Sequence, residues 1–139
     1  MTDGASSALS TFLLDGSPGA ETQAALSTFG QFVGRWRLQW TGFNPGREPD
    51  RAVGELAIDW VLGGRALQDV WTVPGRDQAA TGAAPRGFYG TTIRLFDPTI
   101  GAWRSTWINT TTHRVRRFIG TAVNRTGICG GSVSWFLPR

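Results

Sequence analysis

The stretch that decides the fold is residues 53–73, VGELAIDWVLGGRALQDVWTV. Apolar side chains alternate with polar or small ones on both sides of Gly63-Gly64. Alternation with a period of two is typical of a β-strand that buries one face. Because a glycine pair permits the tight turn of a hairpin, the stretch predicts two antiparallel strands, at 53–61 and 66–73.

The same alternation recurs on both sides of this hairpin. It predicts four further strands, at residues 35–40, 87–96, 102–109 and 115–120. Loops rich in glycine and proline lie at 41–51 and 74–86, and a turn follows Asp97-Pro98. Because no helix intervenes and parallel strands need long crossovers, we expect six strands in an antiparallel meander.

The tryptophans indicate which face of this sheet is buried. There are seven in 139 residues. Six fall on the phase that also carries most aliphatic side chains: Trp36, Trp40, Trp60, Trp71, Trp103 and Trp107. The last strand leaves its phase open, because Val115 and Ile119 compete with Phe118 for the inner face. The pattern predicts an all-β antiparallel barrel whose aromatic interior either packs solid or holds a ligand.

The N-terminal part has a different pattern. Residues 1–20 are small and polar, and we expect them to form a flexible arm. Residues 21–33 predict one helix, since apolar side chains recur there at helical spacing: Leu26, Phe29, Phe32 and Val33. Such a helix would cover one end of the barrel, and residues 21–139 would form a single domain.

Composition limits the classes of function. No apolar run approaches the ~20 residues of a membrane span. Phe12-Leu13-Leu14 is too short for a signal peptide, so we expect a cytoplasmic protein with no membrane partner. Cys129 is the only cysteine, which excludes an internal disulfide. His113 is the only histidine and falls in a predicted turn, so we expect no metal site and no cofactor, haem included.

The net charge of +4 comes from arginine alone, because the chain has 14 basic residues and none is lysine. One dense cluster contains Arg114, Arg116 and Arg117. A nucleic-acid site would need stacking aromatic side chains on the same exposed surface. We therefore interpret the cluster as a solvated strand end and expect no nucleic-acid partner.

Asp69 is the polar residue with the clearest functional interpretation. Its phase places it beside Trp71 on the inner face. A carboxylate there would orient a ligand or act as a general acid or base. The alternatives are a structural salt bridge with Arg117 or Arg65, or a position at the barrel rim.

Other side chains complete the candidate site. The predicted ligand contacts are Trp40, Trp60, Trp71, Trp103 and Trp107. Tyr89, Ser105 and Asn109 would add polar groups to an apolar pocket, which is the usual composition of a small-molecule site. The alternative for these three is ordinary hydrogen bonding at strand ends.

Several motifs resemble those of an uncharacterised bacterial family of calycin-like (lipocalin-like) barrels. They are Gly34-Arg35-Trp36, the segment 60–71, Gly90-Thr91-Thr92-Ile93-Arg94, Phe96-Asp97-Pro98 and Ala102-Trp103-Arg104-x-x-Trp107. The resemblance covers roughly residues 29–120 and implies a calycin-type up-and-down barrel closed at its base by Trp36. It implies no established reaction.

Residues 121–139 depart from the family pattern. Val133, Trp135 and Leu137 could form one closing strand, or the segment could be a truncated or frame-shifted end. A sheet left open exposes unpaired strand edges, which favour a homodimer.

Three hypotheses follow. In the first, the barrel binds a small apolar or aromatic molecule in its interior. In the second, the protein is an enzyme, resembling a cyclase or isomerase, that uses Asp69 as its acid or base. In the third, it is a structural or dimerising module without a ligand.

Overall fold

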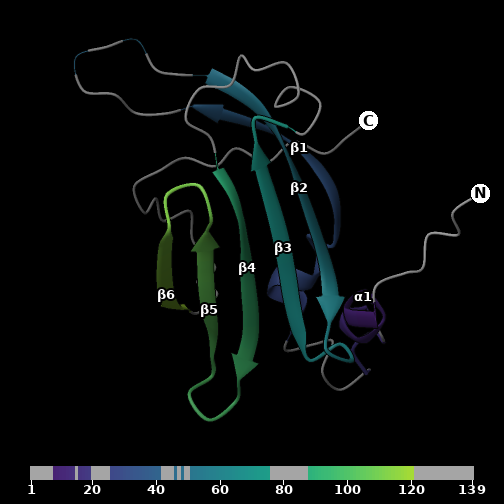
Figure 1. The fold of residues 1–139 in the computed structure, drawn as a ribbon. Coiled ribbons are helices and arrows are strands. Elements are labelled where there is room, and N and C mark those ends of the chain that lie inside the picture. Colours follow the sequence, from purple (N-terminus) through teal and green to yellow (C-terminus); the bar gives the residue numbers. More distant parts are fainter. Residues whose placement is uncertain are drawn as a thin grey trace, which may run out of the picture.

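The described residues form one antiparallel sheet of six strands, and each strand pairs with the next along the chain (Figure 1). The computed structural model describes residues 8–14, 16–19, 26–41, 46, 48, 51–75 and 88–120. The strands are β1 (Gly34–Thr41), β2 (Arg51–Val61), β3 (Ala66–Val73), β4 (Phe88–Asp97), β5 (Ala102–Asn109) and β6 (Arg114–Gly120). The predicted six-stranded meander is therefore confirmed. Within the described ranges the sheet does not close, and β1 and β6 form its two edges.

The turn between β2 and β3 adopts a conformation that its sequence favours. Leu62, Gly63 and Gly64 have φ angles of 58°, 65° and 73°, a left-handed region that glycine enters without steric cost. A Cβ atom on Gly64 would lie 2.3 Å from the backbone nitrogen of Pro18. The second glycine is therefore required both by the turn and by the chain that packs on it.

Part of the segment 1–20, for which a flexible arm is expected, is described in the structure. Residues Ala8–Leu13 form helix α1. The amide of Leu62 donates a hydrogen bond of 3.1 Å to the carbonyl oxygen of Leu13, and Pro18 is buried. This part of the chain packs against the β2–β3 turn because Gly64 leaves room for its backbone.

The core lies on one face of the sheet, here called the inner face. Its buried hydrophobic side chains are Leu38, Leu56, Ile58, Leu67, Val73 and Trp103 from the strands, with Leu26 packed onto them. Residues 26–30 are helical, whereas residues 31–33 are not, so the predicted helix 21–33 is confirmed over 26–30 and ends three residues earlier than expected. Each fully buried leucine of this kind stabilises the fold by about 1.5–3 kcal/mol.

Candidate functional site

The pairing of the strands settles which side chains share the inner face. Residues directly opposite in an antiparallel ladder point to the same side. Trp36 pairs with Leu56, which pairs with Trp71. The remaining inner-face tryptophan pairs are Trp40 with Ala52, Trp60 with Leu67, Trp103 with Phe96 and Trp107 with Thr92. The predicted common face of six tryptophans is confirmed, and Trp135 lies outside the described residues.

Three of these tryptophans are packed by the segment that precedes β1. The ring of Phe29 meets Trp103 edge to face, with centroids 4.9 Å apart. The indole of Trp60 lies so close to Gly30 that a Cβ there would be 2.7 Å from its ring. The Nε1 atom of Trp36 donates a hydrogen bond of 2.8 Å to the carbonyl of the residue at position 32. This part of the inner face is a packed core.

The other inner-face tryptophans contact one another or the neighbouring strands. Trp71 and Trp107 meet edge to face with centroids 5.8 Å apart, and both are half-buried. The Trp107 ring lies over Gly90, where a Cβ would be 2.6 Å from it. Trp40 packs against Phe88 at 5.4 Å. We call Trp71 and Trp107 the tryptophan pair.

Asp69 is held by two donors from β4. Its side chain is 1% exposed. The backbone amide of Thr92 donates to Oδ1 at 2.9 Å, and the guanidinium of Arg94 forms an ion pair with Oδ2. The Arg94 guanidinium also lies 5.3 Å from the centroid of the Phe29 ring, within the range of a cation–π contact.

Asp69 therefore forms a structural salt bridge, which was one of its expected alternatives, but its partner is Arg94 and neither Arg65 nor Arg117. Arg65 lies in the β2–β3 turn. Arg117 pairs with Thr106 on the opposite, outer face of the sheet. Arg94 pairs with Leu67, two positions from Asp69 on the same face of β3. The sequence carries no clear signal for Arg94, because β4 has large side chains on both of its phases.

The three polar side chains expected at the site, Asn109, Ser105 and Tyr89, lie in three different environments. The Asn109 side chain is buried, and its Oδ1 accepts hydrogen bonds from the amides of Thr111 at 3.0 Å and Thr112 at 3.3 Å. It closes the β5–β6 turn, as the strand-end alternative expected. Ser105 is half-buried on the inner face opposite Arg94. Tyr89 is on the outer face and 57% exposed, so its predicted inward position is wrong.

Register explains the error for Tyr89. Gly90 pairs with Trp71 on one side and with Asn109 on the other, which turns Gly90 inward and Tyr89 outward. A side chain at position 90 would clash with the Trp107 ring and with the carbonyl oxygen of Ile108. Only a glycine on the inner face leaves room for the tryptophan pair.

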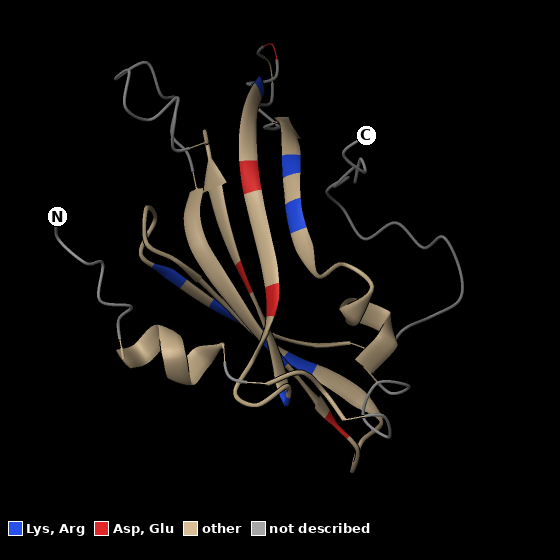
Figure 2. Cartoon of the chain, turned by 90° about the vertical axis from the view of Figure 1, so that its right-hand side faces the viewer, with Lys and Arg blue, Asp and Glu red and all other residues tan. Residues whose placement is uncertain are grey.

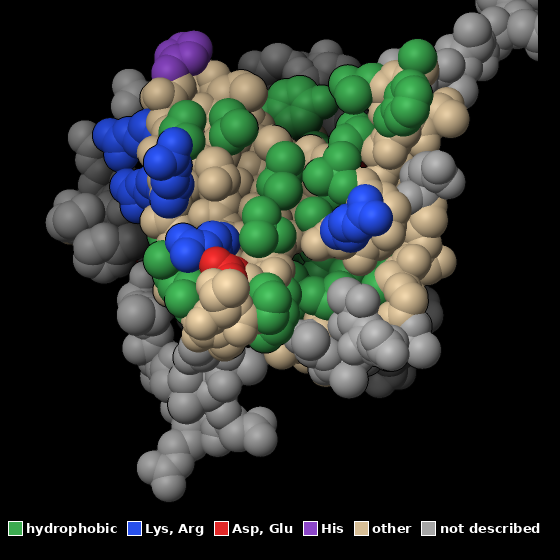
Figure 3. Space-filling view, turned by 90° about the horizontal axis from the view of Figure 1, so that it is seen from below, with side chains coloured by type: hydrophobic (Ala, Val, Ile, Leu, Met, Phe, Trp, Pro, Cys, Tyr) green, Lys and Arg blue, Asp and Glu red, His purple; other side chains and the backbone are tan. Residues whose placement is uncertain are grey.

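His113 and the arginine cluster of β6 do not form a site on the described part of the sheet. His113 is exposed in the β5–β6 turn with a φ of 53°. Arg114 and Arg116 lie on the inner face of β6 and Arg117 on the outer, so the basic cluster is divided. Figure 3 shows basic side chains on both sides of a face whose middle is hydrophobic, with most of them gathered on one side. In the described ranges, no three His, Cys, Asp or Glu side chains gather as metal ligands.

Helix length bears on membrane insertion. None of the helices in the described part of the chain is both long and apolar enough to cross a bilayer. Cys129 lies outside that part.

The sequence did not predict one further feature, a pocket on the outer face of β1–β4 with a volume of about 590 Å3.

Comparison of the chain with models of protein families, with curated proteins and with solved structures found no match.

Proposed function

We propose that the protein binds a small apolar or aromatic molecule on the inner face of its sheet, against the tryptophan pair. The observation that carries the proposal is that these two half-buried rings meet each other edge to face, whereas Trp36, Trp60 and Trp103 are packed by the segment before β1. Indole rings that keep part of their surface exposed can stack on a ligand, and aromatic contacts contribute about 0.5–1.5 kcal/mol beyond area burial. The proposed calycin-like fold agrees with this use of the inner face.

The packed core would hold this site in place. Trp36, Trp60 and Trp103 are engaged by the segment before β1, and they contribute rigidity rather than ligand contact. The surface proposed for the ligand is thus narrower than the five tryptophans expected from the sequence. Rigid supporting elements lower the ordering cost of binding.

The geometry gives less support to an acid or base at Asp69. Both carboxylate oxygens already accept contacts, from Thr92 and Arg94. A general base must also come within hydrogen-bond reach of the substrate proton, and the Asp69 side chain is only 1% exposed. The ion pair instead supports a structural role for Asp69, joining β3 to β4 beside the tryptophan pair.

The test uses N-phenyl-1-naphthylamine, an uncharged aromatic probe whose fluorescence rises in apolar surroundings. The full chain should enhance its emission saturably and transfer energy to it from tryptophan. Trp107→Leu should weaken binding about tenfold, which corresponds to ~1.4 kcal/mol.

Ile108→Ala is the matched control, because Ile108 is the next residue of β5 and lies on the outer face. It should bind the probe as the parent protein does. Far-UV circular dichroism checks that both variants keep the sheet. Absence of saturable binding, or equal losses in both variants, would overturn the proposal.

A second candidate function is self-association through β6. Val115 and Ile119 on its outer face and Phe118 on its inner face are exposed. Exposed apolar side chains on an edge strand favour pairing with another copy. The oligomeric state in solution tests this candidate.

A further inference from the structure

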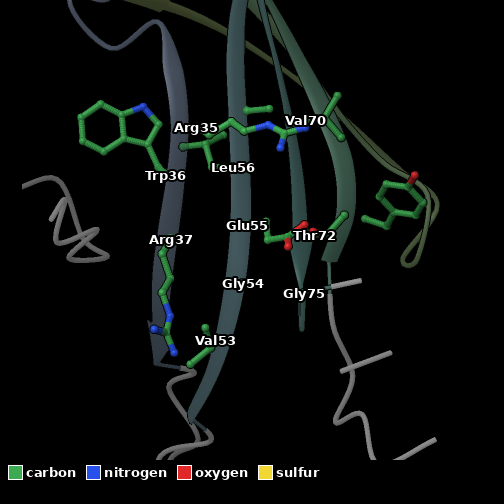
Figure 4. A pocket seen from close by; sticks show the side chains of 12 residues that line it. Arg35, Trp36, Arg37, Val53, Gly54, Glu55, Leu56, Val70, Thr72 and Gly75 are labelled. Atoms are coloured by element: carbon green, nitrogen blue, oxygen red, sulfur yellow. The ribbon is translucent and has the colours of Figure 1, made fainter. Parts of the chain in front are cut away.

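The outer-face pocket lies on the side of the sheet opposite the tryptophan pair. It is lined by side chains of β1, β2 and β3 together with Gly75 and Tyr89 (Figure 4). Its volume of about 590 Å3 is within the range of about 300–1,000 Å3 that is usual for small-molecule sites. The hollow lies over Ala57, whose small side chain faces outward between Arg35 and Val70.

The charges of the pocket favour an anion. Arg35 and Arg37 lie on β1, and Figure 4 shows Arg35 reaching across β2 toward Val70. Glu55 is opposite Arg37 in the ladder, and its Cγ lies 3.4 Å from where a Cβ on Gly75 would be. Two guanidinium groups against one carboxylate leave the described lining with excess positive charge. Figure 2 shows the basic positions of β1 beside the acidic ones of β2.

Thr72 supplies an independent indication of a ligand. It lines the pocket and is 8% exposed, and its Oγ1 has no hydrogen-bond partner among the described residues. Buried hydroxyl groups are nearly always satisfied, so a buried orphan calls for an explanation such as an absent ligand. An acceptor atom in the pocket would satisfy this hydroxyl.

The other walls are apolar or aromatic. Val53, Ala57 and Val70 contribute hydrophobic surface, and the phenol of Tyr89 stands at the edge beside Thr72. A ligand that fits all of these walls has an anionic group and an apolar body.

We propose that this pocket binds a small organic carboxylate. Its carboxylate meets Arg35 and accepts a hydrogen bond from the Thr72 hydroxyl, and its apolar body lies against Ala57 and Val70, while Arg37 adds positive charge beside Val53 at the other end of the pocket. Arginine is suited to this task, since its planar fork of donors matches a carboxylate. The site is separate from the inner face, so either assignment can fail without the other.

The experiment is a titration of the isotopically labelled full chain, followed through its backbone amide signals. Benzoate is the probe. Benzyl alcohol has the same aromatic ring without a negative charge, and inorganic phosphate has a negative charge without an apolar group. Benzoate should shift amides around the outer face of β1–β3 saturably, at least tenfold more tightly than either comparison ligand. Shifts confined to the inner face, or equal binding of all three ligands, would overturn the proposal.

Substitutions separate specific contact from general attraction. Arg35→Gln should weaken benzoate binding about tenfold and Arg37→Gln by a smaller factor, whereas Arg117→Gln on the outer face of β6 should change it less than twofold. An equal loss in Arg117→Gln would show bulk electrostatics and contradict a site.

Thr72→Val tests the hydroxyl, with Thr106→Val on β5 as its control. Thr72→Val should keep the fold while weakening benzoate binding severalfold, and Thr106→Val should not. Unchanged binding in Thr72→Val would overturn the assigned contact with the hydroxyl.

Discussion

Asp69 is the buried charged side chain of the described residues, and its environment is made by two neighbours on β4. Removing a carboxylate from water costs several kcal/mol, which the Arg94 guanidinium and the Thr92 amide offset. Asp69→Asn keeps the shape but leaves Arg94 without its counter-charge. We expect the free energy of unfolding to fall by about 3 kcal/mol, measured by urea denaturation.

Asp59→Asn is the control for this prediction. Asp59 is exposed on the outer face of β2, so its substitution should change stability by less than ~0.5 kcal/mol. If Asp69→Asn proved as stable as Asp59→Asn and lost a catalytic turnover instead, the enzyme hypothesis would displace the structural role.

Single residues also show where sequence patterns reach their limit. Trp71 and Trp107 could be placed because each falls in a strand with one clearly apolar phase. Tyr89 could not, since β4 carries large side chains on both phases and follows a long loop that leaves its register free. The inward Gly90 decides the phase through the Trp107 ring, and such a contact between strands is not visible in one segment.

At the scale of elements, the β4–β5 turn is fixed by Asp97. Its carboxylate accepts hydrogen bonds from the hydroxyl and amide of Thr99, at 2.5 and 3.0 Å, and from Arg104 Nε at 2.7 Å. The Thr99 hydroxyl first, and then Arg104, lower the pKa of Asp97 from 3.8 to about 2. The folded protein therefore binds this proton more weakly than the unfolded chain.

A dependence on pH follows from that direction. The contribution of the turn to stability is complete above about pH 4 and is lost as the pH falls through about 2. Asp97→Asn removes it at every pH. Melting temperatures followed by circular dichroism should differ most between parent and variant above about pH 4 and converge toward about pH 2. A difference that stayed constant over this range would contradict the assigned interactions.

Turns of this kind explain why the elements were predictable. Gly63-Gly64 and Asp97-Pro98 mark reversals by their backbone preferences, and the strands between them follow from alternation. The phase of β6 was open because it carries apolar and basic residues on both faces. Its pairing with β5 places Phe118 opposite Ser105 on the inner face, which again is information from the neighbouring strand.

At the scale of the whole molecule, closure of the sheet is the feature that the sequence patterns could not decide. Alternation gives the strands and their order, because neighbours in the chain pair with each other. Closure depends instead on whether distant strands meet. In the described ranges β1 and β6 remain edges. Experiment can therefore test whether the β6 edge pairs with another strand.

Self-association is the expected consequence if β6 pairs with a second copy. Val115, Phe118 and Ile119 are 61%, 51% and 65% exposed, so both faces of this strand offer apolar surface beside its edge. Sedimentation velocity should then show a dimer whose fraction rises with protein concentration. Ile119→Lys should shift the equilibrium to monomer, since a lysine on an edge strand opposes pairing.

Ile100→Lys separates this effect from a general gain in solubility. Ile100 is also exposed, at 47%, but it lies in the β4–β5 turn away from the strand edge. Ile100→Lys adds the same charge and removes the same type of side chain as Ile119→Lys. Because position 100 is away from the β6 edge, this variant should leave the dimer intact. A parent protein that stays monomeric at every concentration, or equal dissociation in both variants, would show that β6 does not mediate assembly. The exposed side chains of β6 would then have to be explained within the single chain.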